Sequence, residues 1–248
     1  MKIGIIGAGQ LGRMLALAGY PLGQRFVFVD IDEEAPGAQV GRIIPGQFDD
    51  PAALAALAAS VDVVTFDVEN VPQEAAEAVA EKVPFYPPPA ALGAGQDRLG
   101  EKRLFESLGI PTTAHAAVDS QAGLQEAAQR IGLPAILKTR RLGYDGRGQR
   151  RLDTPDELEG AFDSLGGVPA ILEAFVDFER ELSLVGVRGR DGALAFWPLA
   201  ENTHAEGILR QTRAPWTDAA LQAEAERHLQ ALLARFDYVG VLTVEFFL

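Results

Sequence analysis

The chain has 248 residues, no cysteine and a formal net charge of −13. This length suggests one large or two medium domains, and the lack of cysteine excludes disulfides, thiolate metal sites and cysteine nucleophiles. No apolar run approaches the roughly 20 residues of a membrane-spanning helix, the first residues lack the pattern of a signal peptide, and the acidic charge opposes binding to nucleic acid, so we expect a cytoplasmic protein with neither a membrane nor a nucleic-acid partner.

Strands and helices alternate over the first third of the chain. Apolar runs predict the strands, while 3.6-residue periodicity, capping residues and prolines predict the helices. The expected elements are strands Lys2–Ile6, Phe26–Asp30 and Val61–Phe66, and helices Gln10–Ala18 (with Leu11, Met14, Leu15 and Ala18 as its apolar stripe), Pro51–Ala59 and Pro72–Glu81. This alternation predicts a parallel, doubly wound sheet.

The remainder of the chain carries a second α/β pattern that changes after Phe178. Up to that point the expected helices are Asp97–Leu108, Ser120–Ile131 and Thr154–Leu165, and the expected strands are Thr113–Val118, Ala135–Thr139 and Ala170–Phe175. Beyond it we expect strands Leu182–Arg188, Ala193–Leu199, Ile208–Arg213 and Tyr238–Leu248, and a long helix capped by Thr217 or Asp218 with Leu221, Ala225, Leu229, Leu232 and Phe236 on one stripe.

A glycine-rich turn follows the first strand. Residues Gly7–Gly12 form a G-x-G-x-x-G string between an expected strand and helix. In this context glycines allow a tight turn and close approach of a ligand, and the free N–H groups at the helix start can hold a phosphate. Asp30 stands about where a ribose-binding acid lies in a dinucleotide fold. An NAD-dependent dehydrogenase is the first hypothesis, and a tight turn without a ligand is the alternative.

Elsewhere in the sequence, few polar residues are candidates for ligand binding or proton transfer in a dehydrogenase. Glu69 follows the strand Val61–Phe66, and the carboxyl ends of parallel strands face the ligand crevice, so Glu69 either meets the ligand of the glycine turn or is a solvated loop acid. Proton transfer would need a suitable His or Lys. His115 and His228 look like ordinary surface or helix residues, and only His204 lies in a polar stretch.

A basic window interrupts the acidic chain between Lys138 and Arg151, where six cations face one acid, Asp145. Lys138 ends an apolar strand, and the loop Gly143–Gln149 that follows holds three glycines. A glycine-rich loop rich in backbone donors beside a lysine can wrap a triphosphate. The alternative is the solvated tip of a basic β-hairpin.

Single acids interrupt two otherwise apolar strands. Glu173 lies in Ile171–Val176, where a carboxylate is costly unless it is paired, and the same strand could present backbone groups to an adenine edge. Glu181, just downstream, suits a ribose hydroxyl. Glu245 lies in the final strand, and its carboxylate suits Mg²⁺, which prefers oxygen ligands. One carboxylate is rarely a complete metal site.

Taken in order, Lys138, the glycine-rich loop, Glu173–Val176, Glu181 and Glu245 resemble the ATP-grasp superfamily. Within it, several strings resemble the 5-(carboxyamino)imidazole ribonucleotide synthetase family of purine biosynthesis. These strings are Gly9–Met14, Gly143–Gln149, Glu201–His204 with Gly207–Arg210, and Tyr238–Val241 with Glu245–Phe246. The resemblance spans the whole chain. One departure is Phe66–Val68, where the family often has a second Glu or an aromatic residue.

The resemblance implies an α/β ATP-grasp fold with three parts. These are a Rossmann-like (biotin-carboxylase-like) parallel-sheet domain at residues 1–96, a connecting helix and lid domain at 97–178, and the first part of a C-terminal α+β domain at 179–248. It also implies an ATP-dependent carbon–nitrogen ligase. The expected reaction uses ATP to phosphorylate bicarbonate, and the carboxyphosphate then carboxylates the 5-amino group of 5-aminoimidazole ribonucleotide, releasing ADP and phosphate.

The resemblance also implies roles for individual residues. Asp145, Lys138 and Arg147 would be catalytic, and Gly9, Gln10, Leu11 and Glu69 would bind the ribonucleotide. Glu245 would bind Mg²⁺, or Mn²⁺ in its place. The expected ATP-binding residues are Arg98, Lys138, Gly143, Tyr144, Asp145, Gly146, Arg147, Gly148, Gln149, Glu173, Ala174, Phe175, Val176, Glu181 and His204. A homodimer is expected as well.

Three alternatives stay open at this point. One is another ATP-grasp enzyme, a biotin-carboxylase-like enzyme or a formyl transferase. The dehydrogenase explains only the first third of the chain, and a non-catalytic nucleotide sensor is the third alternative. Family members continue past Leu248 with a second metal-ligating segment and a basic substrate-binding region. We therefore expect either a truncated protein or a sequence that is part of a longer one, and we expect a protein ending at Leu248 to be inactive or to bind MgATP poorly.

Overall fold

The structure is a computed structural model that describes residues 1–143, 148–205 and 207–248. The chain divides into two compact units, each described by itself below. The first comprises residues 1–93 and 236–240, and the second comprises residues 94–235 and 241–248.

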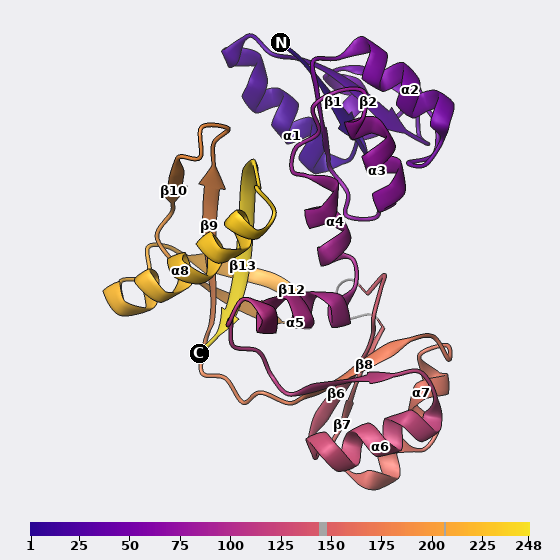
Figure 1. The fold of residues 1–248 in the computed structure, drawn as a ribbon, viewed down its shortest axis with the longest axis vertical. Helices are drawn as coiled ribbons and strands as arrows, with labels where there is room; N and C mark the ends of the chain where they lie inside the picture. Colours follow the sequence, from indigo (N-terminus) through magenta and orange to yellow (C-terminus); the bar gives the residue numbers. More distant parts are fainter. Residues whose placement is uncertain (144–147, 206) are drawn as a thin grey trace. The chain divides into compact units, whose positions relative to one another are not determined.

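A parallel four-stranded sheet forms the centre of the first unit (Figure 1). Its order is β3 (Arg42–Pro45), β2 (Arg25–Asp30), β1 (Lys2–Ile6) and β4 (Val63–Phe66), with every neighbouring pair parallel. The predicted parallel, doubly wound sheet is confirmed. Strand β3 was missed because it is a four-residue edge strand ending in proline, which carries too little apolar pattern.

Helices cover both faces of this sheet. Helix α1 (Gln10–Gly19) packs on the face that carries Ile5 and Phe28, whereas α2 (Pro51–Ser60) and α3 (Gln73–Ala80) pack on the face that carries Ile6 and Val64. Alternate residues of a strand point to opposite faces, so each strand feeds both cores. Asp50 caps α2 by accepting from the backbone N–H groups of Ala52 and Ala53. A further short helix, α4 (Pro89–Gly95), was not predicted.

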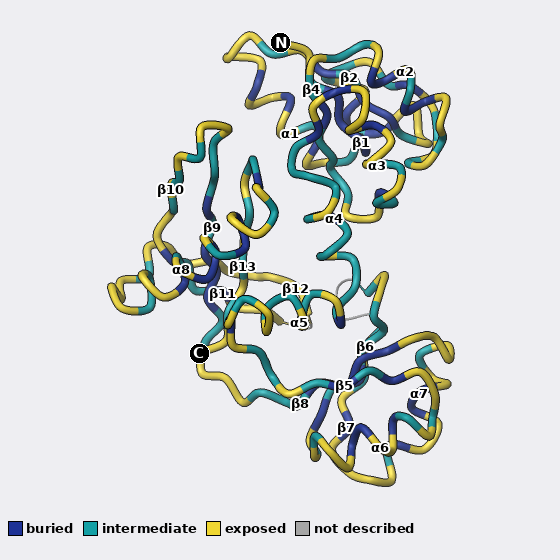
Figure 2. The backbone as a smooth tube through the Cα atoms, viewed as in Figure 1, coloured by how far each residue is buried: buried dark blue, intermediate teal, exposed yellow. Residues whose placement is uncertain are grey.

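The apolar stripe predicted for α1 faces solvent rather than the core. Leu11, Met14, Leu15 and Ala18 are exposed, and the buried residues of the helix are Gly12, Ala16 and Gly19 (Figure 2). A Cβ on Gly19 would lie 2.4 Å from the ring of Phe26. The small residues therefore let the helix lie directly on β2, and prediction from hydrophobicity alone selected the wrong face.

The second unit contains an antiparallel sheet of order β5 (His115–Val118), β8 (Ala170–Ala174), β6 (Ala135–Thr139) and β7 (Gln149–Leu152). Helices α6 (Gln121–Ile131) and α7 (Ala161–Ser164) pack on one face. Strand β7 was missed because three of its four residues are polar. The predicted helix Thr154–Leu165 is wrong: a 3₁₀ turn at Pro155–Leu158 and α7 are separated by Gly160, whose φ of 67° suits glycine.

Another sheet of the second unit is built around β9 (Glu181–Arg188). It pairs with β10 (Leu194–Phe196), β11 (Ala200–Ala205) and β13 (Gly240–Phe247), and β12 (Ile208–Arg213) pairs with β11. Helix α8 (Ala219–Arg235) buries Ala225, Leu229 and Leu232, as predicted, and Asp218 rather than Thr217 accepts from its first N–H groups. Strand β11 was missed because its polar sequence resembles a loop.

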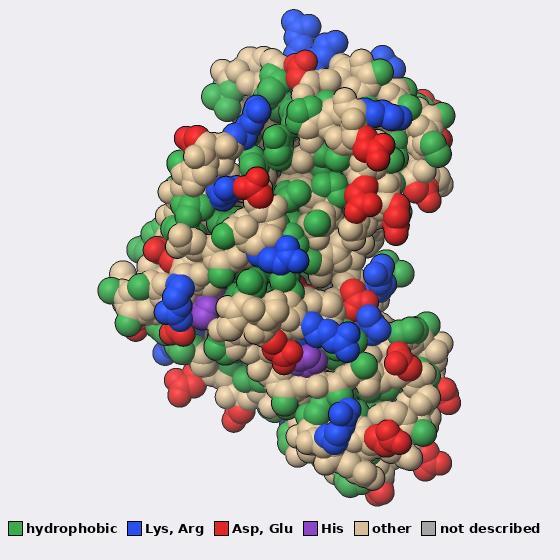
Figure 3. Space-filling model, in the orientation of Figure 1, with side chains coloured by type: hydrophobic (Ala, Val, Ile, Leu, Met, Phe, Trp, Pro, Cys, Tyr) green, Lys and Arg blue, Asp and Glu red, His purple; other side chains and the backbone are tan. Residues whose placement is uncertain are grey.

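Charges are spread over the surface. On the face drawn in Figure 3, acidic and basic side chains are interspersed, as in a solvated globular protein of negative net charge. Among the described residues, no helix has the length and apolar character needed to cross a membrane.

The exposure of the α1 stripe gives a stability prediction. Leu57 of α2 is fully buried, whereas Leu15 of α1 is 47% exposed. We expect Leu57→Ala to lower the free energy of unfolding by about 2–5 kcal/mol, because it leaves a cavity, and Leu15→Ala to change it by about 0.5 kcal/mol or less. Urea denaturation followed by circular dichroism measures both. Equal losses would contradict the assignment of the buried face of α1.

Candidate active site

A cavity of about 520 Å³ lies within the second unit. Its walls come from α5 (Arg98–Ser107), β6, β8 with the segment after it, α8 and β13. Most of the lining is apolar, and a few charged groups converge on it, among them Lys102, Lys138, Glu173 and Glu245. This combination is typical of a small-molecule site. His228, expected to be an ordinary helix residue, is buried and also lines the cavity.

Lys138 and Glu173 form an ion pair on the cavity wall. Leu137 of β6 and Leu172 of β8 belong to the core under α6, so the residues next to them in sequence point to the opposite face, toward the cavity. Lys138 Nζ donates to Glu173 Oε2 at 2.8 Å, and the Glu173 side chain is only 8% exposed. The acid that interrupts an apolar strand is therefore paired, as burial requires.

Helix α5 brings a second lysine, Lys102, near the same carboxylate. The sequence analysis missed this lysine. Lys102 Nζ lies 3.9 Å from Glu173 Oε2. Beside it, burial raises the pKa of Glu101, and the negative charge of Glu173 adds to this, whereas Lys102 and Lys138 oppose it. The only sequence signal for Lys102 is its position on an amphipathic helix, which does not reveal a partner so distant along the chain.

The segment Glu173–Val176 lines the cavity with all four of its residues. Thr113 Oγ1 donates to the backbone carbonyl of Ala174, and the Phe175 N–H donates to the carbonyl of Pro134. The guanidinium of Arg151 lies 4.0 Å from the centre of the Phe175 ring. These contacts fix the backbone of the predicted adenine-binding strand where it leaves β8.

Glu181 and His204 are brought together on neighbouring strands. The register pairs Asn202 of β11 with Glu181 of β9, and His204 Nδ1 is hydrogen-bonded to Glu181 Oε2. Just before β9, Arg180 donates to Glu201 of β11 at 2.6 Å. Neither Glu181 nor His204 is among the described residues that line the cavity, although Leu182, next to Glu181, does line it. The structure therefore places these two predicted nucleotide contacts beside each other but not in the cavity wall.

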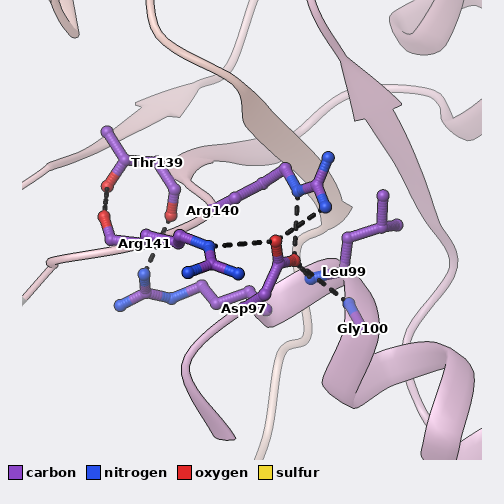
Figure 4. A network of polar contacts seen from close by, with 7 residues as sticks. Asp97, Leu99, Gly100, Thr139, Arg140 and Arg141 are labelled. Atoms are coloured by element: carbon purple, nitrogen blue, oxygen red, sulfur yellow. Dashed lines mark hydrogen bonds and ion pairs between the residues drawn. The ribbon is translucent and has the colours of Figure 1, made fainter. Parts of the chain in front are cut away.

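The stem of the glycine-rich loop is tied to the start of α5 through Asp97 (Figure 4). The Asp97 carboxylate caps α5 by accepting from the N–H groups of Leu99 and Gly100, and it accepts two hydrogen bonds from Arg140, at 3.0 and 2.6 Å. Burial by itself raises the pKa of Asp97, but the hydrogen bonds from Arg140 and the helix start, together with the charge of Arg140, bring it below its usual value.

Arg98 holds the same stem through its guanidinium. It donates to the carbonyls of Thr139 and Gly143, at 2.8 and 3.1 Å. The Thr139 N–H in turn donates to the carbonyl of Gly148, which closes the stem from the other side. Gly148 has a φ of 69°, and a Cβ there would lie 2.7 Å from Thr139 Oγ1. Both constraints favour glycine.

The predicted site residues of the loop are only partly described. Gly143, Gly148 and Gln149 lie at its two ends, and Gln149 is the first residue of β7. The predicted residues Tyr144, Asp145, Gly146 and Arg147 lie outside the described residues. The basic hairpin weighed against a nucleotide loop is present as β6 and β7, so the two interpretations describe one structure rather than excluding each other.

The acidic residues near the N-terminal glycine turn are arranged differently from those of a dinucleotide-binding site. Asp30 Oδ2 accepts from the Ala8 N–H at 2.7 Å, so this carboxylate holds the turn itself. A Cβ on Gly9 would lie 2.8 Å from Asp67 Oδ2, a buried oxygen that accepts no hydrogen bond from any described residue. An acid against the start of α1 opposes phosphate binding there. Sequence analysis noted Asp67 only as a departure from the family.

The predicted ribonucleotide contacts gather near this turn. Gly9 precedes α1, and Gln10 and Leu11 are exposed in its first turn. Glu69 is exposed after β4, which pairs with β1, the strand that leads into the glycine turn. Neighbouring parallel strands thus bring these residues to the same sheet edge, as the topology predicts.

A magnesium site is not complete in the described residues. Glu245 lies on the exposed face of β13 and lines the cavity, where it offers one carboxylate. No group of three or more His, Asp or Glu residues that could hold a metal ion occurs in residues 1–143, 148–205 and 207–248. A divalent cation needs more oxygen ligands than this single carboxylate supplies.

Two family models match the chain. The model of the ATP-grasp domain matches residues 103–248, and that of the ribonucleotide synthetase preATP-grasp domain matches residues 1–96. A curated relative from Pseudomonas aeruginosa, N5-carboxyaminoimidazole ribonucleotide synthase, is 53% identical over 247 residues, which are 100% of this chain and 68% of the relative.

Solved structures resemble the chain over its length. The N5-carboxyaminoimidazole ribonucleotide synthetase of Thermus thermophilus is 50% identical with a TM-score of 0.92, covering 99% of this chain and 67% of that one. The synthase of Aspergillus clavatus, in complex with ADP and 5-aminoimidazole ribonucleotide, is 29% identical with a TM-score of 0.89, covering 100% and 66%. The chain thus spans about two thirds of these relatives.

The Asp97 network predicts a pH-dependent stability. Asn caps helices well, so Asp97→Asn removes mainly the charge, and we expect it to cost about 1.5–3 kcal/mol at pH 7, the range for charged hydrogen bonds. Because folding lowers the pKa of Asp97, its contribution is complete above the unfolded pKa of about 3.9 and is lost as the pH falls through the folded value. Urea denaturation of both proteins from pH 7 to pH 3 measures the difference, which should shrink only below about pH 4; a pH-independent difference would contradict the role of the charge.

Proposed function

This chain belongs to the N5-carboxyaminoimidazole ribonucleotide synthase family of ATP-grasp ligases, and we propose that it takes part in the ATP- and bicarbonate-dependent carboxylation of 5-aminoimidazole ribonucleotide. The observation that carries the proposal is the cavity of the second unit, which combines apolar walls with Lys138 and the Glu173–Val176 segment. A base fits the apolar walls, and the lysine supplies a point charge for phosphate oxygens.

The proposed reaction has two steps. A bicarbonate oxygen attacks the γ-phosphorus of ATP, the bond to the β-phosphate oxygen breaks, and ADP leaves. The 5-amino nitrogen of the ribonucleotide then bonds to the carboxyl carbon of the carboxyphosphate, or of the CO₂ it releases, while phosphate leaves and the nitrogen loses a proton. Such phosphoryl transfer depends mainly on positioning and on neutralising charge.

We assign the nucleotide contacts to the second unit. Lys138 binds phosphate oxygens, and Arg98 contributes by holding the stem of the loop Gly143–Gln149, within which Asp145 and Arg147 are proposed to face the reacting groups. Glu173–Val176 holds the base, and the Glu181–His204 pair binds elsewhere on the nucleotide. A loop closed over the phosphates would also exclude water from the labile carboxyphosphate.

We assign the ribonucleotide contacts to the first unit, to Gly9, Gln10, Leu11 and Glu69. The Asp67 carboxylate packed against Gly9 places a negative charge beside the start of α1, which does not favour the phosphate of a dinucleotide there. This arrangement, together with the family membership, replaces the hypothesis of an NAD-dependent dehydrogenase. Neither the formyl transferase nor the nucleotide sensor has comparable support.

Further proposals rest on the family and on the surface. Mg²⁺, or Mn²⁺, would neutralise phosphate charge, and Glu245 is the one ligand we propose for it.

We propose a cytoplasmic location because the substrates are small phosphorylated metabolites. We also propose a homodimer, supported by the exposed Met14, Leu15 and Leu17 of α1; light scattering should then give twice the mass of the chain, and a monomeric mass at all concentrations would contradict it.

Phosphate release tests the proposed function. The intact protein, rather than one ending at Leu248, should release phosphate from ATP in the presence of Mg²⁺ at a rate that rises when both bicarbonate and 5-aminoimidazole ribonucleotide are added. Phosphate release at the same rate with and without the ribonucleotide would contradict the proposal. A rise in melting temperature with NAD but none with ATP would contradict it as well.

The substitution Lys138→Met tests whether ATP binds in the cavity. We expect ATP affinity to fall about tenfold or more, because a charge-assisted hydrogen bond contributes about 1.5–3 kcal/mol. Lys82→Met makes the same substitution at an exposed lysine of the first unit and should leave ATP affinity unchanged. Titration calorimetry measures both affinities.

A further inference from the structure

Two lysines share one buried carboxylate oxygen in the cavity wall. Lys138 Nζ lies 2.8 Å from Glu173 Oε2, and Lys102 Nζ lies 3.9 Å from the same atom. The lysine side chains are 22% and 20% exposed, and that of Glu173 is 8% exposed. Of the two lysines, Lys138 is the one that makes a hydrogen bond to the carboxylate. Lys102 stands about one ångström beyond hydrogen-bond distance.

This arrangement raises a difficulty for the phosphate-binding role of Lys138. A lysine that turns toward a triphosphate leaves the carboxylate with which it was paired. Removing one partner of a buried pair is strongly unfavourable, because the remaining charge has lost both water and its counterion. Without a replacement cation, the free-energy cost of leaving Glu173 unpaired would lower the affinity for the nucleotide.

We propose that Lys102 is a positioning residue that takes over Glu173 when Lys138 engages the phosphates of ATP. The inference rests on the proposed function, since it requires a nucleotide in this cavity. Lys102 has to extend by only about one ångström to reach hydrogen-bond distance, and a lysine stem has several rotatable bonds. Glu173 therefore stays paired in both states, while Lys138 is free to move.

The surroundings of Lys102 support this exchange. Its helix, α5, is fixed at its start by Asp97 and Arg140, so the lysine is held beside the carboxylate while its side chain extends. Burial raises the pKa of the adjacent Glu101, and the charge of Glu173 adds to this rise, whereas Lys102, Arg98 and Lys138 oppose it. Both lysines therefore contribute to the electrostatic field around these carboxylates.

Other titratable groups also face this region, and the experiment has to separate them from Glu173. His115 is opposite Glu173 on β5 and lies near Glu106 of α5. Glu224, His228 and Glu245 line the same cavity from α8 and β13. All of them are present in every protein compared below, so a difference from the unchanged protein reports on the substituted lysine.

Lys102→Met tests the exchange through the protons taken up when ATP binds. With no second lysine, Glu173 is stranded when Lys138 leaves it, and burial then favours its protonated form. Calorimetric titration with ATP and Mg²⁺ in two buffers of different ionisation enthalpy should show extra proton uptake, approaching one per ATP. From pH 6 to pH 8, the affinity should fall by up to about a hundredfold more than that of the unchanged protein, because linkage to one proton changes the affinity about tenfold per pH unit.

Two variants serve as matched controls. Lys102→Arg keeps the cation and should restore the proton count of the unchanged protein. Arg103→Met removes the neighbouring, exposed cation of α5 and should leave the count unchanged. Without nucleotide, Lys102→Met should melt close to the unchanged protein, because Lys138 still neutralises Glu173.

The outcomes separate this inference from the proposed function. If the unchanged protein binds no ATP, the proposed function fails, and this inference fails with it. If it binds ATP but Lys102→Met shows no extra proton uptake, the exchange is wrong and the proposed function stands. A uniform loss of affinity at every pH, or a lower melting temperature without nucleotide, would indicate a merely structural Lys102 and would likewise overturn the exchange.

Discussion

The buried carboxylate of Glu173 is the constraint around which the second unit is organised. It lies in a strand whose neighbours are apolar, so it has to be compensated from elements on either side. Strand β6 supplies Lys138 and helix α5 brings Lys102 near the same oxygen. The cavity therefore has a charged end built by a strand and a helix distant in sequence, and an apolar remainder that suits a base.

Alternation along β6 and β8 makes this possible. Leu137 and Leu172 fill the core under α6, and the same alternation turns Lys138 and Glu173 toward the cavity. The sheet thus has one face that packs in the core of the unit and one that lines the cavity. Because both faces come from the same two-residue alternation, a shift of register by one residue would exchange core and cavity lining together.

Much of this could be predicted from the sequence, and the failures have physical causes. The parallel sheet and the need for a partner at Glu173 follow from local patterns. Strands β3, β7 and β11 are short or polar, so they carry little periodic signal, and the buried face of α1 consists of small residues that hydrophobicity does not select. Lys102 was missed because its partner is fixed by tertiary packing.

Helix α5 links two parts of the proposed nucleotide site. Asp97, which caps the helix, and Arg98, its first residue, hold the stem of the glycine-rich loop, and Lys102, one turn later, stands beside Glu173. Since these residues share one short helix, the distance between the loop stem and the carboxylate is set by helix geometry rather than by flexible side chains. A rigid spacing of this kind keeps the loop stem and the backbone of Lys102 in place while the lysine side chains change partners, which lowers the ordering cost of binding.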